Sequence, residues 1–451
     1  MAQRTQRLIE AARRPLPEGT FVVGAGLLVA GLSAYGFQIL SFRALTEANY
    51  NALNGLWVFV FVLAPGFYLP LEQEVGRALA DRRVKGLGGR PVVERAAIAG
   101  LVLTIILAIV AGAAAAGTPL IDDLFEGSTG LAMCLVIALF TYGTQHLARG
   151  TLSGSARFGS YGLIIGAEGV FRFVPCAALA IADVGDPAWY GLCLALPPAF
   201  AAALALSRER QLLTPGPHAP WSELSTNLGF LFFASISAQA LGYAPFLGAV
   251  LVRAGDQATE VANFLAGVFL ARIPILLFQA VQAALLPKLA GLAGAGRQDE
   301  FRTGLRKLVV VIVSVGGIGV LAAATLGPQV GEILFGKKFD LGHEDLALLT
   351  AGSSIFILAL TLAQALIALM GHWRVLVAWL TGIVAFVAVF LASEHNRFDR
   401  EAVEIAFIIG AFASAATMGV MLFIRMRAGI IPDDEALARL AEQIEHEPLE
   451  L

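Results

Sequence analysis

The sequence predicts an all-α, polytopic membrane protein, and three observations indicate this fold class. In the 451-residue chain, 57% of the residues are hydrophobic, only 14% are charged and the mean hydropathy is +0.76. Soluble domains have about 25% charged residues, so this chain has too few ionisable side chains to cover a surface that faces water. The apolar residues also form long unbroken runs, without the alternating pattern of barrel strands.

Twelve of these runs are long enough to cross a bilayer, because a helix needs about 20 residues to span the hydrocarbon core. Each run ends at charged residues or at a cluster of Pro, Gly, Asp and Asn, which mark the loops between spans. In chain order, the predicted spans cover residues 19–41, 53–75, 96–117, 130–149, 159–183, 188–206, 226–251, 261–287, 308–327, 346–370, 375–393 and 404–425.

The loop charges predict that both termini are cytoplasmic. Most of the 31 lysines and arginines fall in segments that this orientation places inside the cell, as the positive-inside rule requires. We therefore expect a multi-pass protein of the cytoplasmic membrane. Topology alone accounts for the largest basic cluster, and a lipid-headgroup site is the alternative. This cluster lies between the second and third spans and contains Arg77, Arg82, Arg83, Lys85, Arg90 and Arg95.

The last six spans repeat the first six at an offset of 209 residues. The matching residues are types that are uncommon within spans, and this makes them more informative than the low overall identity. Because an even number of spans separates the copies, both halves enter the membrane in the same direction, as in transporters with parallel repeats. The matches include Asn54 with Asn263, Pro65 with Pro274, Gln73 with Gln282, Pro119 with Pro328 and Gly127 with Gly336.

The repeat defines the predicted domain organisation. Prolines inside spans free backbone groups and bend helices, so the paired Pro65 and Pro274 are candidate hinges, with simple packing kinks as the alternative. The predicted segments are a cytoplasmic N-terminal segment (1–18), an N-terminal six-helix bundle (19–206), a cytoplasmic linker (207–225), a C-terminal six-helix bundle (226–427) and an acidic cytoplasmic tail (428–451).

Short motifs recur at the helix ends: the segment from Pro328 to Gly336 with its weaker copy from Pro119 to Gly127, the sequence Leu71-Glu-Gln-Glu-Val-Gly-Arg77, and the turns Gly154-Ser-Ala-Arg157 and Gly371-His-Trp-Arg374. With these motifs the chain resembles the multidrug/oligosaccharidyl-lipid/polysaccharide (MOP) exporter superfamily, and within it the bacterial polysaccharide flippases. The resemblance implies a MATE-like fold with two six-helix bundles in a V around a central cavity. It also implies that an undecaprenyl-pyrophosphate-linked oligosaccharide is moved to the outer leaflet, for lipopolysaccharide or other cell-surface polysaccharide biosynthesis.

Two related groups fit the sequence less well. Twelve predicted spans argue against a close match to the peptidoglycan-precursor flippases, which have two extra helices. The segment from Gly76 to Arg83 is similar to the loop signature of the major facilitator superfamily. That signature, however, places three residues between the glycine and Asp81, where this chain has four, and it expects a glycine at Val84.

Arg272 is the first candidate for binding substrate, since ionisable residues inside spans are costly and are functional by default. It aligns with Leu63 of the first half and is therefore not part of the shared architecture. Gln279 falls seven residues later, on the same helical face. We hypothesise that Arg272 binds the pyrophosphate or an acidic sugar, because guanidinium forms paired hydrogen bonds with phosphate. An interhelical ion pair is the alternative.

The other ionisable residues in or near the spans are also candidate functional residues, and each has two interpretations. Arg172 follows Glu168 by four residues, the order that favours an ion pair, and a cation facing the cavity is the alternative. Glu72 and Glu74, at the cytoplasmic end of the second span, are candidates for a gate or a proton acceptor, or else anchors at the membrane interface. Near the external helix ends, Arg43 and Glu404 line either the outward mouth or an exposed rim, and His146 is either a packed histidine or a proton relay.

The sequence favours a transporter over an enzyme. It contains no phosphate-binding loop for ATP hydrolysis. The first and seventh spans carry Gln38 and Gln239 but no acid, which disfavours the second hypothesis, an ion-coupled antiporter of drugs or small solutes. A membrane glycosyltransferase or polymerase is the third hypothesis, and Asp122-Asp123 is the paired acid that would support it. Such enzymes, however, need a larger external loop than any in this sequence.

No cofactor or metal is expected. The cysteines Cys134, Cys176 and Cys193 lie in apolar runs, as buried hydrophobic residues do. The expected partners are the lipid-linked oligosaccharide, membrane lipids and the polysaccharide assembly machinery. A net charge of −3 without a basic domain does not favour nucleic-acid binding.

Overall fold

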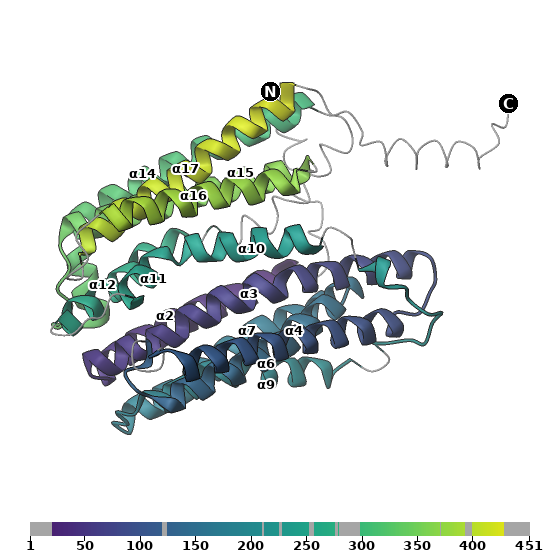
Figure 1. Cartoon of the computed structure of the whole chain (residues 1–451), viewed down its shortest axis with the longest axis horizontal. Coiled ribbons are helices and arrows are strands. Elements are labelled where there is room, and N and C mark those ends of the chain that lie inside the picture. Colours follow the sequence, from purple (N-terminus) through teal and green to yellow (C-terminus); the bar gives the residue numbers. More distant parts are fainter. Residues whose placement is uncertain are drawn as a thin grey trace, which may run out of the picture.

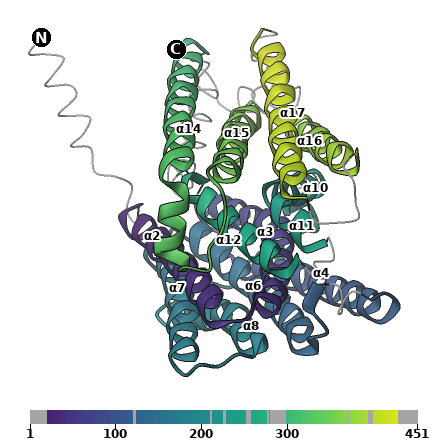
Figure 2. The same cartoon turned by 90° about the vertical axis from the view of Figure 1, so that its left-hand side faces the viewer.

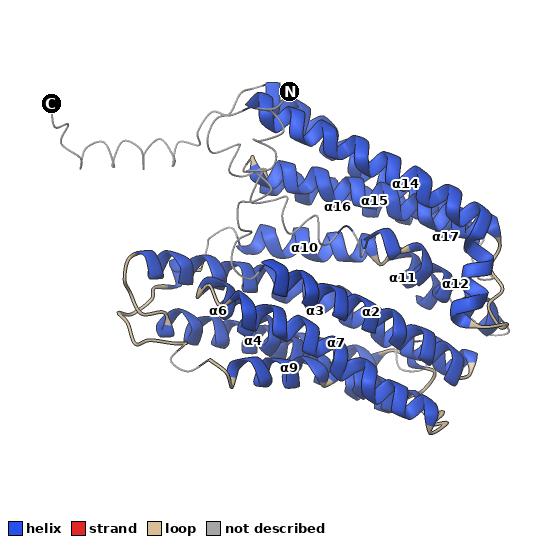
Figure 3. Ribbon diagram, turned by 180° about the vertical axis from the view of Figure 1, so that it is seen from behind, coloured by secondary structure: helices blue, strands red, loops and turns tan. Residues whose placement is uncertain are grey.

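The computed structural model is helical wherever it describes the chain, and no strand occurs among the described residues (Figure 3). The expected all-α fold class is confirmed. The described residues are 20–119, 124–209, 212–224, 228–251, 257–275, 278, 298–369, 371–392 and 399–427.

The first half begins with five long helices, and its sixth predicted span is divided into two shorter ones at Leu196. Pro197 begins the second of these, and because proline has no N–H to donate, the helical hydrogen bonding of the first cannot continue through it. The helices are α2 (Thr20–Ala44), α3 (Glu47–Val84), α4 (Arg90–Gly117), α6 (Thr129–Gly154), α7 (Phe158–Ile181), α8 (Pro187–Ala195) and α9 (Pro197–Leu206).

The second half also contains a divided span, because its first two helices are bent by 65° relative to each other. A short 3₁₀ helix, η1 (Trp221–Glu223), lies in the linker between the halves. The helices of the second half are α10 (Leu228–Gly242), α11 (Ala244–Leu251), α12 (Ala258–Ala271), α14 (Gln298–Phe335), α15 (His343–Ala368), α16 (His372–Ala392) and α17 (Arg400–Arg427).

The number of spans agrees with the sequence. Among the described residues, 11 helices are long and apolar enough to cross a membrane, and the bent α10–α11 pair raises the number to 12. The eighth predicted span, 261–287, lies only partly within the described residues, and its helix is interrupted at Arg272. Helix α12 ends at Ala271, where the nearby Pro274 disfavours a continuous helix.

Some helices extend beyond the predicted spans, because hydropathy detects only the part of a helix that lies in hydrocarbon. Helix α3 continues from the predicted end at residue 75 to Val84. Ion pairs of 2.8 Å between Glu74 and Arg77, and between Asp81 and Lys85, stabilise this polar extension at helical spacing.

The helices form two groups, with α10, α11 and α12 between them (Figures 1 and 2). One group contains α14 to α17 and the other α2 to α9. Helix α10 packs on α3 of the first half: the Ser235 hydroxyl donates to the Pro65 carbonyl at 3.1 Å, and the rings of Phe67 and Phe232 are 6.4 Å apart. A Cβ on Gly66 would lie 3.2 Å from the Ile236 Cα, so a glycine permits this close approach.

The two halves also meet at the end of the molecule where α2 gives way to α3, the end predicted to be external. The Arg43 Nη2 donates to the Ile333 carbonyl at 2.8 Å, and the rings of Phe42 and Phe335 pack edge to face at 5.4 Å. Nearby, the Lys338 ammonium lies 3.7 Å from a Glu47 carboxylate oxygen. These contacts join the halves at that end of the molecule.

The internal repeat is visible in the backbone. Gly127 and Gly336, which the sequence pairs, both adopt left-handed φ angles, of 77° and 93°. A glycine tolerates this conformation without the steric cost that a Cβ adds. The two glycines therefore form equivalent turns, after α4 in the first half and after α14 in the second.

Candidate functional site

Five aromatic side chains connect the two halves where α3 faces α10 to α12. We call this set, Trp57, Phe61, Tyr243, Phe246 and Phe269, the aromatic layer. The rings of Phe61 and Tyr243 stack at 6.3 Å, and Trp57 meets Phe269 edge to face at 5.4 Å. Within the second half, Phe246 and Phe269 are 4.8 Å apart. Such pairs contribute packing energy beyond the area that they bury, so this layer is a specific contact between the halves.

Arg272 faces the aromatic layer from the second half. It is the C-cap residue of α12 and is only partly buried. Its guanidinium lies 4.1 Å from the centroid of the Tyr243 ring and 5.6 Å from that of Phe246, within the range of cation–π attraction. No described carboxylate lies within 4 Å of it, so the interhelical ion pair considered above is absent from the described residues.

The backbone partner of Arg272 is the carbonyl of Gly242, which accepts a hydrogen bond from Nη1. Gly242 is the last residue of α10, where the bend into α11 begins. The last carbonyls of a helix have no intrahelical partner, and Arg272 satisfies one of them. Arg272 thus connects α12 to the bend of the divided span, and no described carboxylate neutralises its charge.

Arg172 approaches the aromatic layer from the first half and is 3% exposed. Its guanidinium lies 5.6 Å from the ring centroid of Trp57 and 5.5 Å from that of Phe61. It also donates to Glu168, the partner expected from the four-residue spacing. Glu168 accepts further hydrogen bonds, from the Tyr142 hydroxyl at 3.0 Å and the Gln145 amide at 2.9 Å. This arginine is therefore neutralised within its own half.

A second polar cluster surrounds Glu72 inside the first half. This carboxylate is 5% exposed and lies 2.7 Å from the His146 Nδ1. The Tyr161 hydroxyl donates to it at 3.0 Å, and the Arg149 guanidinium lies 3.4 Å away. Three groups from α6 and α7 thus hold Glu72 in place on α3, and His146 is packed within the same cluster.

Helix α6 carries residues of both clusters, and sequence reasoning singled out only one of them, His146. Tyr142, Gln145, His146 and Arg149 follow one another at spacings of three, one and three residues and therefore lie near one face of α6. The signal was available, because four polar side chains within eight residues of one span are uncommon. Their recurrence at helical spacing would have predicted a polar stripe facing α3 and α7.

Two further candidate residues, Glu74 and Arg43, make contacts outside the cluster around Glu72. Glu74 is buried and pairs with Arg77, whose Nη2 also donates to the Glu223 carbonyl at 2.6 Å. Glu72 and Glu74 thus face different partners although they are two residues apart. Arg43 is exposed and joins α2 to the end of α14.

Glu404, in the first turns of α17, is fully buried. Neither of its carboxylate oxygens has a hydrogen-bond partner among the described residues. Burying an ionised carboxylate without a partner is costly. Glu404 is therefore part of no exposed rim, and it forms no ion pair with a described residue.

The candidate hinges differ in their local structure. Pro65 lies within α3, which continues through it, whereas Pro274 follows the end of α12 at Arg272. Gln279, the predicted neighbour of Arg272, lies outside the described residues, as do Asp122 and Asp123.

Metal chemistry finds no support in the described part of the chain. No group of three His, Cys, Asp or Glu side chains suited to a metal ion occurs there. Cys134, Cys176 and Cys193 are buried and free, in agreement with their position in apolar runs.

Comparison of the sequence with known proteins gives distant relatives of similar length. No protein-family profile matches the chain. The uncharacterized protein Rv1510 of Mycobacterium tuberculosis (strain ATCC 25618 / H37Rv) is 26% identical over 396 residues, which cover 84% of this chain and 86% of that protein. The uncharacterized protein Rv3630 of the same strain is 27% identical over 367 residues, with coverage of 77% and 79%.

Comparison of the structure with solved structures is more informative about the fold. A multidrug resistance MATE family transporter of the MOP superfamily in its inward-facing conformation superimposes with a TM-score of 0.71 at 14% identity, covering 91% of this chain and 98% of that one. The outward-facing conformation of such a transporter gives 0.66, with coverage of 91% and 96%. A variant of the Vibrio cholerae MATE transporter VcmN gives 0.65, also at 14% identity, with coverage of 91% and 97%. The chain thus has a MATE-like fold, as the resemblance implied.

Proposed function

We propose that the protein is a membrane exporter that works by alternating access, and that its substrate is an oligosaccharide linked through pyrophosphate to a polyprenyl lipid. The observation that carries this proposal is the position of Arg272. It is a cation without a described carboxylate partner, at the junction of the two halves and beside the break in a divided span. A transporter with parallel halves binds its substrate between them, so this is the place where an anionic substrate group is expected.

The chemistry of Arg272 suits a phosphate group. A guanidinium has five N–H donors, and one of them is used by the Gly242 carbonyl. The remaining donors can bind phosphate oxygens in pairs, which an ammonium cannot match. Arg172 is a weaker candidate, because Glu168 already neutralises it.

The arrangement of the halves supports an inward-facing state. Their contacts at Arg43, Phe42 and Glu47 lie at the end predicted to be external. The higher TM-score with an inward-facing MATE transporter than with an outward-facing one agrees with this assignment. In an alternating-access cycle these contacts break when the protein opens outward.

Two experiments test the proposal. In the first, the gene is deleted in its host, and the lipid-linked sugar is quantified on the cytoplasmic leaflet. Accumulation that is reversed by the wild-type gene but not by Arg272→Ala supports the flippase, whereas normal levels in the deletion strain contradict it.

In the second experiment, the double variant Glu47→Cys/Lys338→Cys is treated with a short bifunctional thiol reagent. Locking the halves together at the contact between these residues should stop export, and each single variant is the matched control. Because the natural cysteines are buried, the reagent acts at the introduced thiols. Full export by the cross-linked protein would contradict alternating access at this contact.

An ion-coupled antiporter of drugs or small solutes is the second candidate, and one observation favours it. Glu404 is a buried carboxyl group without a described hydrogen-bond partner, as a site that takes up and releases a proton can be. Dye efflux from proteoliposomes that depends on an imposed proton or sodium gradient, and is lost in Glu404→Gln, would support this candidate. Movement of lipid-linked sugar without such a gradient would favour the flippase.

A further inference from the structure

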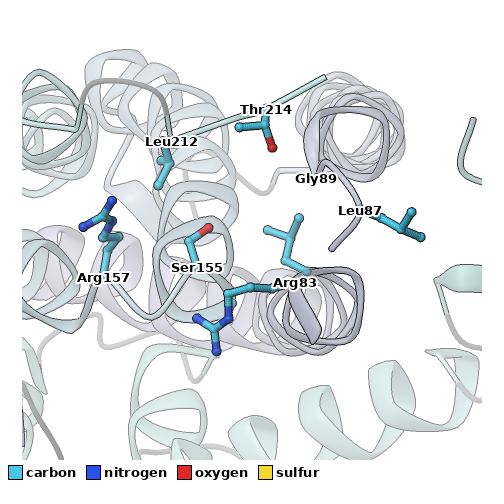
Figure 4. A pocket seen from close by; sticks show the side chains of 9 residues that line it. Arg83, Leu87, Gly89, Ser155, Arg157, Leu212 and Thr214 are labelled. Carbon is cyan, nitrogen blue, oxygen red and sulfur yellow. The ribbon is translucent and has the colours of Figure 1, made fainter. Parts of the chain in front are cut away.

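A small polar pocket lies in the first half, at the end of the molecule opposite the Arg43 contact. Its volume is about 190 Å³, and its walls come from the end of α3, the start of α4, the turn between α6 and α7, and the linker. The polar residues of the lining are Arg83, Arg157, Ser155 and Thr214. Figure 4 shows Ser155 between the two arginines. This end of the molecule is predicted to be cytoplasmic.

Arg83 differs from the other members of its basic cluster. Four of them, Arg77, Arg82, Lys85 and Arg90, each pair with a carboxylate at 2.7 to 2.8 Å. Arg95 contacts His218 and the Trp221 ring. No described carboxylate lies within 4 Å of the Arg83 guanidinium, and Arg83 is one of the residues that line the pocket. The orientation rule explains why the cluster is basic, but not why one member has this environment.

Arg157 lines the same pocket from the turn that follows α6. Its one described carboxylate partner, Glu209, is 3.4 Å away, farther than the partners within the basic cluster, and also accepts from the Ser160 hydroxyl at 2.5 Å. The hydroxyls of Ser155 and Thr214 have no described hydrogen-bond partner. Two guanidinium groups and two hydroxyls therefore offer donors to a pocket with a net positive charge.

The backbone segments around the pocket pack closely against one another. An ideal Cβ on Gly88 would lie 1.9 Å from the Pro215 carbonyl oxygen, and one on Gly154 would lie 2.6 Å from that of Gly76. The Arg90 N–H donates to the Thr214 carbonyl at 3.1 Å, which fixes the linker against the start of α4. The N-terminus of this long helix adds a partial positive charge beside the pocket.

We propose that this pocket binds a phosphate group, with Arg83 and Arg157 as its charged ligands and Ser155 as a further donor. Such a group is carried either by the headgroup of an anionic membrane phospholipid or by a soluble phosphate in the cytoplasm. The pocket is separate from the Arg272 site and does not depend on which substrate is transported. Because Leu212 and Thr214 form one wall, an occupant contacts the described part of the linker, residues 212–224.

The test compares two phosphate probes on the purified full-length protein. Inorganic phosphate is titrated by calorimetry in neutral detergent at 0.15 M salt, and dioleoyl-phosphatidylglycerol is titrated by native mass spectrometry. The double variant Arg83→Gln/Arg157→Gln should weaken binding at least about tenfold, since charge-assisted hydrogen bonds are the strong ones. Ser155→Ala should weaken it less. Lys85→Gln removes a charge two residues from Arg83 and should leave binding within about twofold, because Lys85 does not line the pocket and pairs with Asp81.

The outcomes separate the sources of the phosphate. Arginine-dependent binding of phosphatidylglycerol alone identifies a lipid headgroup, and such binding of inorganic phosphate identifies a soluble ligand. The proposal is overturned if neither probe binds, or if the double variant binds both as tightly as the wild type while its elution on gel filtration and its helical circular dichroism are unchanged.

Discussion

The guanidinium of Arg272 lies 4.1 Å from the centre of the Tyr243 ring, and it donates to the carbonyl of the residue that precedes this tyrosine. Arg272 thus holds α12 against the bend between α10 and α11. Through Phe61, which stacks on Tyr243, the same contact reaches α3 in the other half. A ligand that draws Arg272 away from Gly242 would therefore alter the junction of the two halves. This gives substrate binding a direct physical route to a change in their packing.

The first prediction concerns this arginine. Arg272→Ala should reduce transport at least about 100-fold, because it removes both a charge-assisted phosphate contact and a cap on α10. Arg272→Lys should retain part of the activity, since a lysine keeps the charge without the paired geometry. Arg306→Gln, an exposed arginine in α14, is the control. Transport of the lipid-linked sugar into proteoliposomes provides the measurement, and equal rates for all three variants would refute a role for Arg272.

The second prediction contrasts two buried carboxylates. Glu72→Gln should lower the free energy of unfolding by about 3–5 kcal/mol, because it leaves Arg149 as an unpaired charge inside the protein. Glu404→Gln should leave the stability unchanged or raise it, because no hydrogen bond is lost and a carboxyl group that is costly to ionise is replaced by an amide. Thermal unfolding in detergent measures both variants. A loss for Glu404→Gln as large as that for Glu72→Gln would show that Glu404 has a partner in the folded protein.

Much of the fold was predictable, because membrane-spanning runs and internal repeats can be recognised directly in the amino-acid sequence. Span length, the polar segment 207–225 and the pairing of Gly127 with Gly336 all follow from composition and offset. The extension of α3 to Val84 was missed, because hydropathy identifies membrane-spanning segments and does not detect a helix that continues into water. The interruption of the eighth span at Arg272 was also missed, although Pro274 carried a signal for it.

The site was only partly predictable, because partners come from other helices. The four-residue spacing was enough to predict the pair of Glu168 and Arg172. No spacing could reveal that Glu72 meets His146 across α3 and α6, or that Arg272 meets the end of α10. Those contacts depend on how the helices pack, and a single sequence without homologues contains no direct record of that packing.

The third prediction tests the turn shared by the two halves. Gly336→Ala should destabilise the protein by about 1 kcal/mol, because its φ of 93° is unfavourable for a residue with a Cβ. Steric contact is not the cause, since the nearest atom that a Cβ would meet is the Arg43 Nε at 3.8 Å. Gly112→Ala inside α4, where a Cβ would meet nothing within 4 Å, is the matched control and should stabilise the helix slightly. Melting temperatures of both variants give the comparison, and equal shifts of the same sign would contradict the backbone argument.

The fourth prediction concerns the attachment of the linker to α3. Arg82 is 3% exposed and binds both carboxylate oxygens of Glu223, at 2.8 and 3.0 Å. It also donates to the Gly88 and Pro217 carbonyls. The hydrogen bonds from Arg82 lower the pKa of Glu223. A lowered pKa means that the pair contributes its full stability above the carboxyl group's usual pKa, and that this contribution is lost as the pH falls through the lowered value.

Hydrogen exchange of the amides in residues 212–224 measures this attachment. Protection should be constant near neutral pH and should decrease in acid, whereas Glu223→Gln should show the lower protection at every pH, by about 1.5–3 kcal/mol in local opening energy. Glu94→Gln, which breaks an exposed pair with Arg90, should leave the linker unaffected. Protection that does not depend on pH in the wild type, or a linker that is equally protected in Glu223→Gln, would show that other contacts hold this segment against the first half.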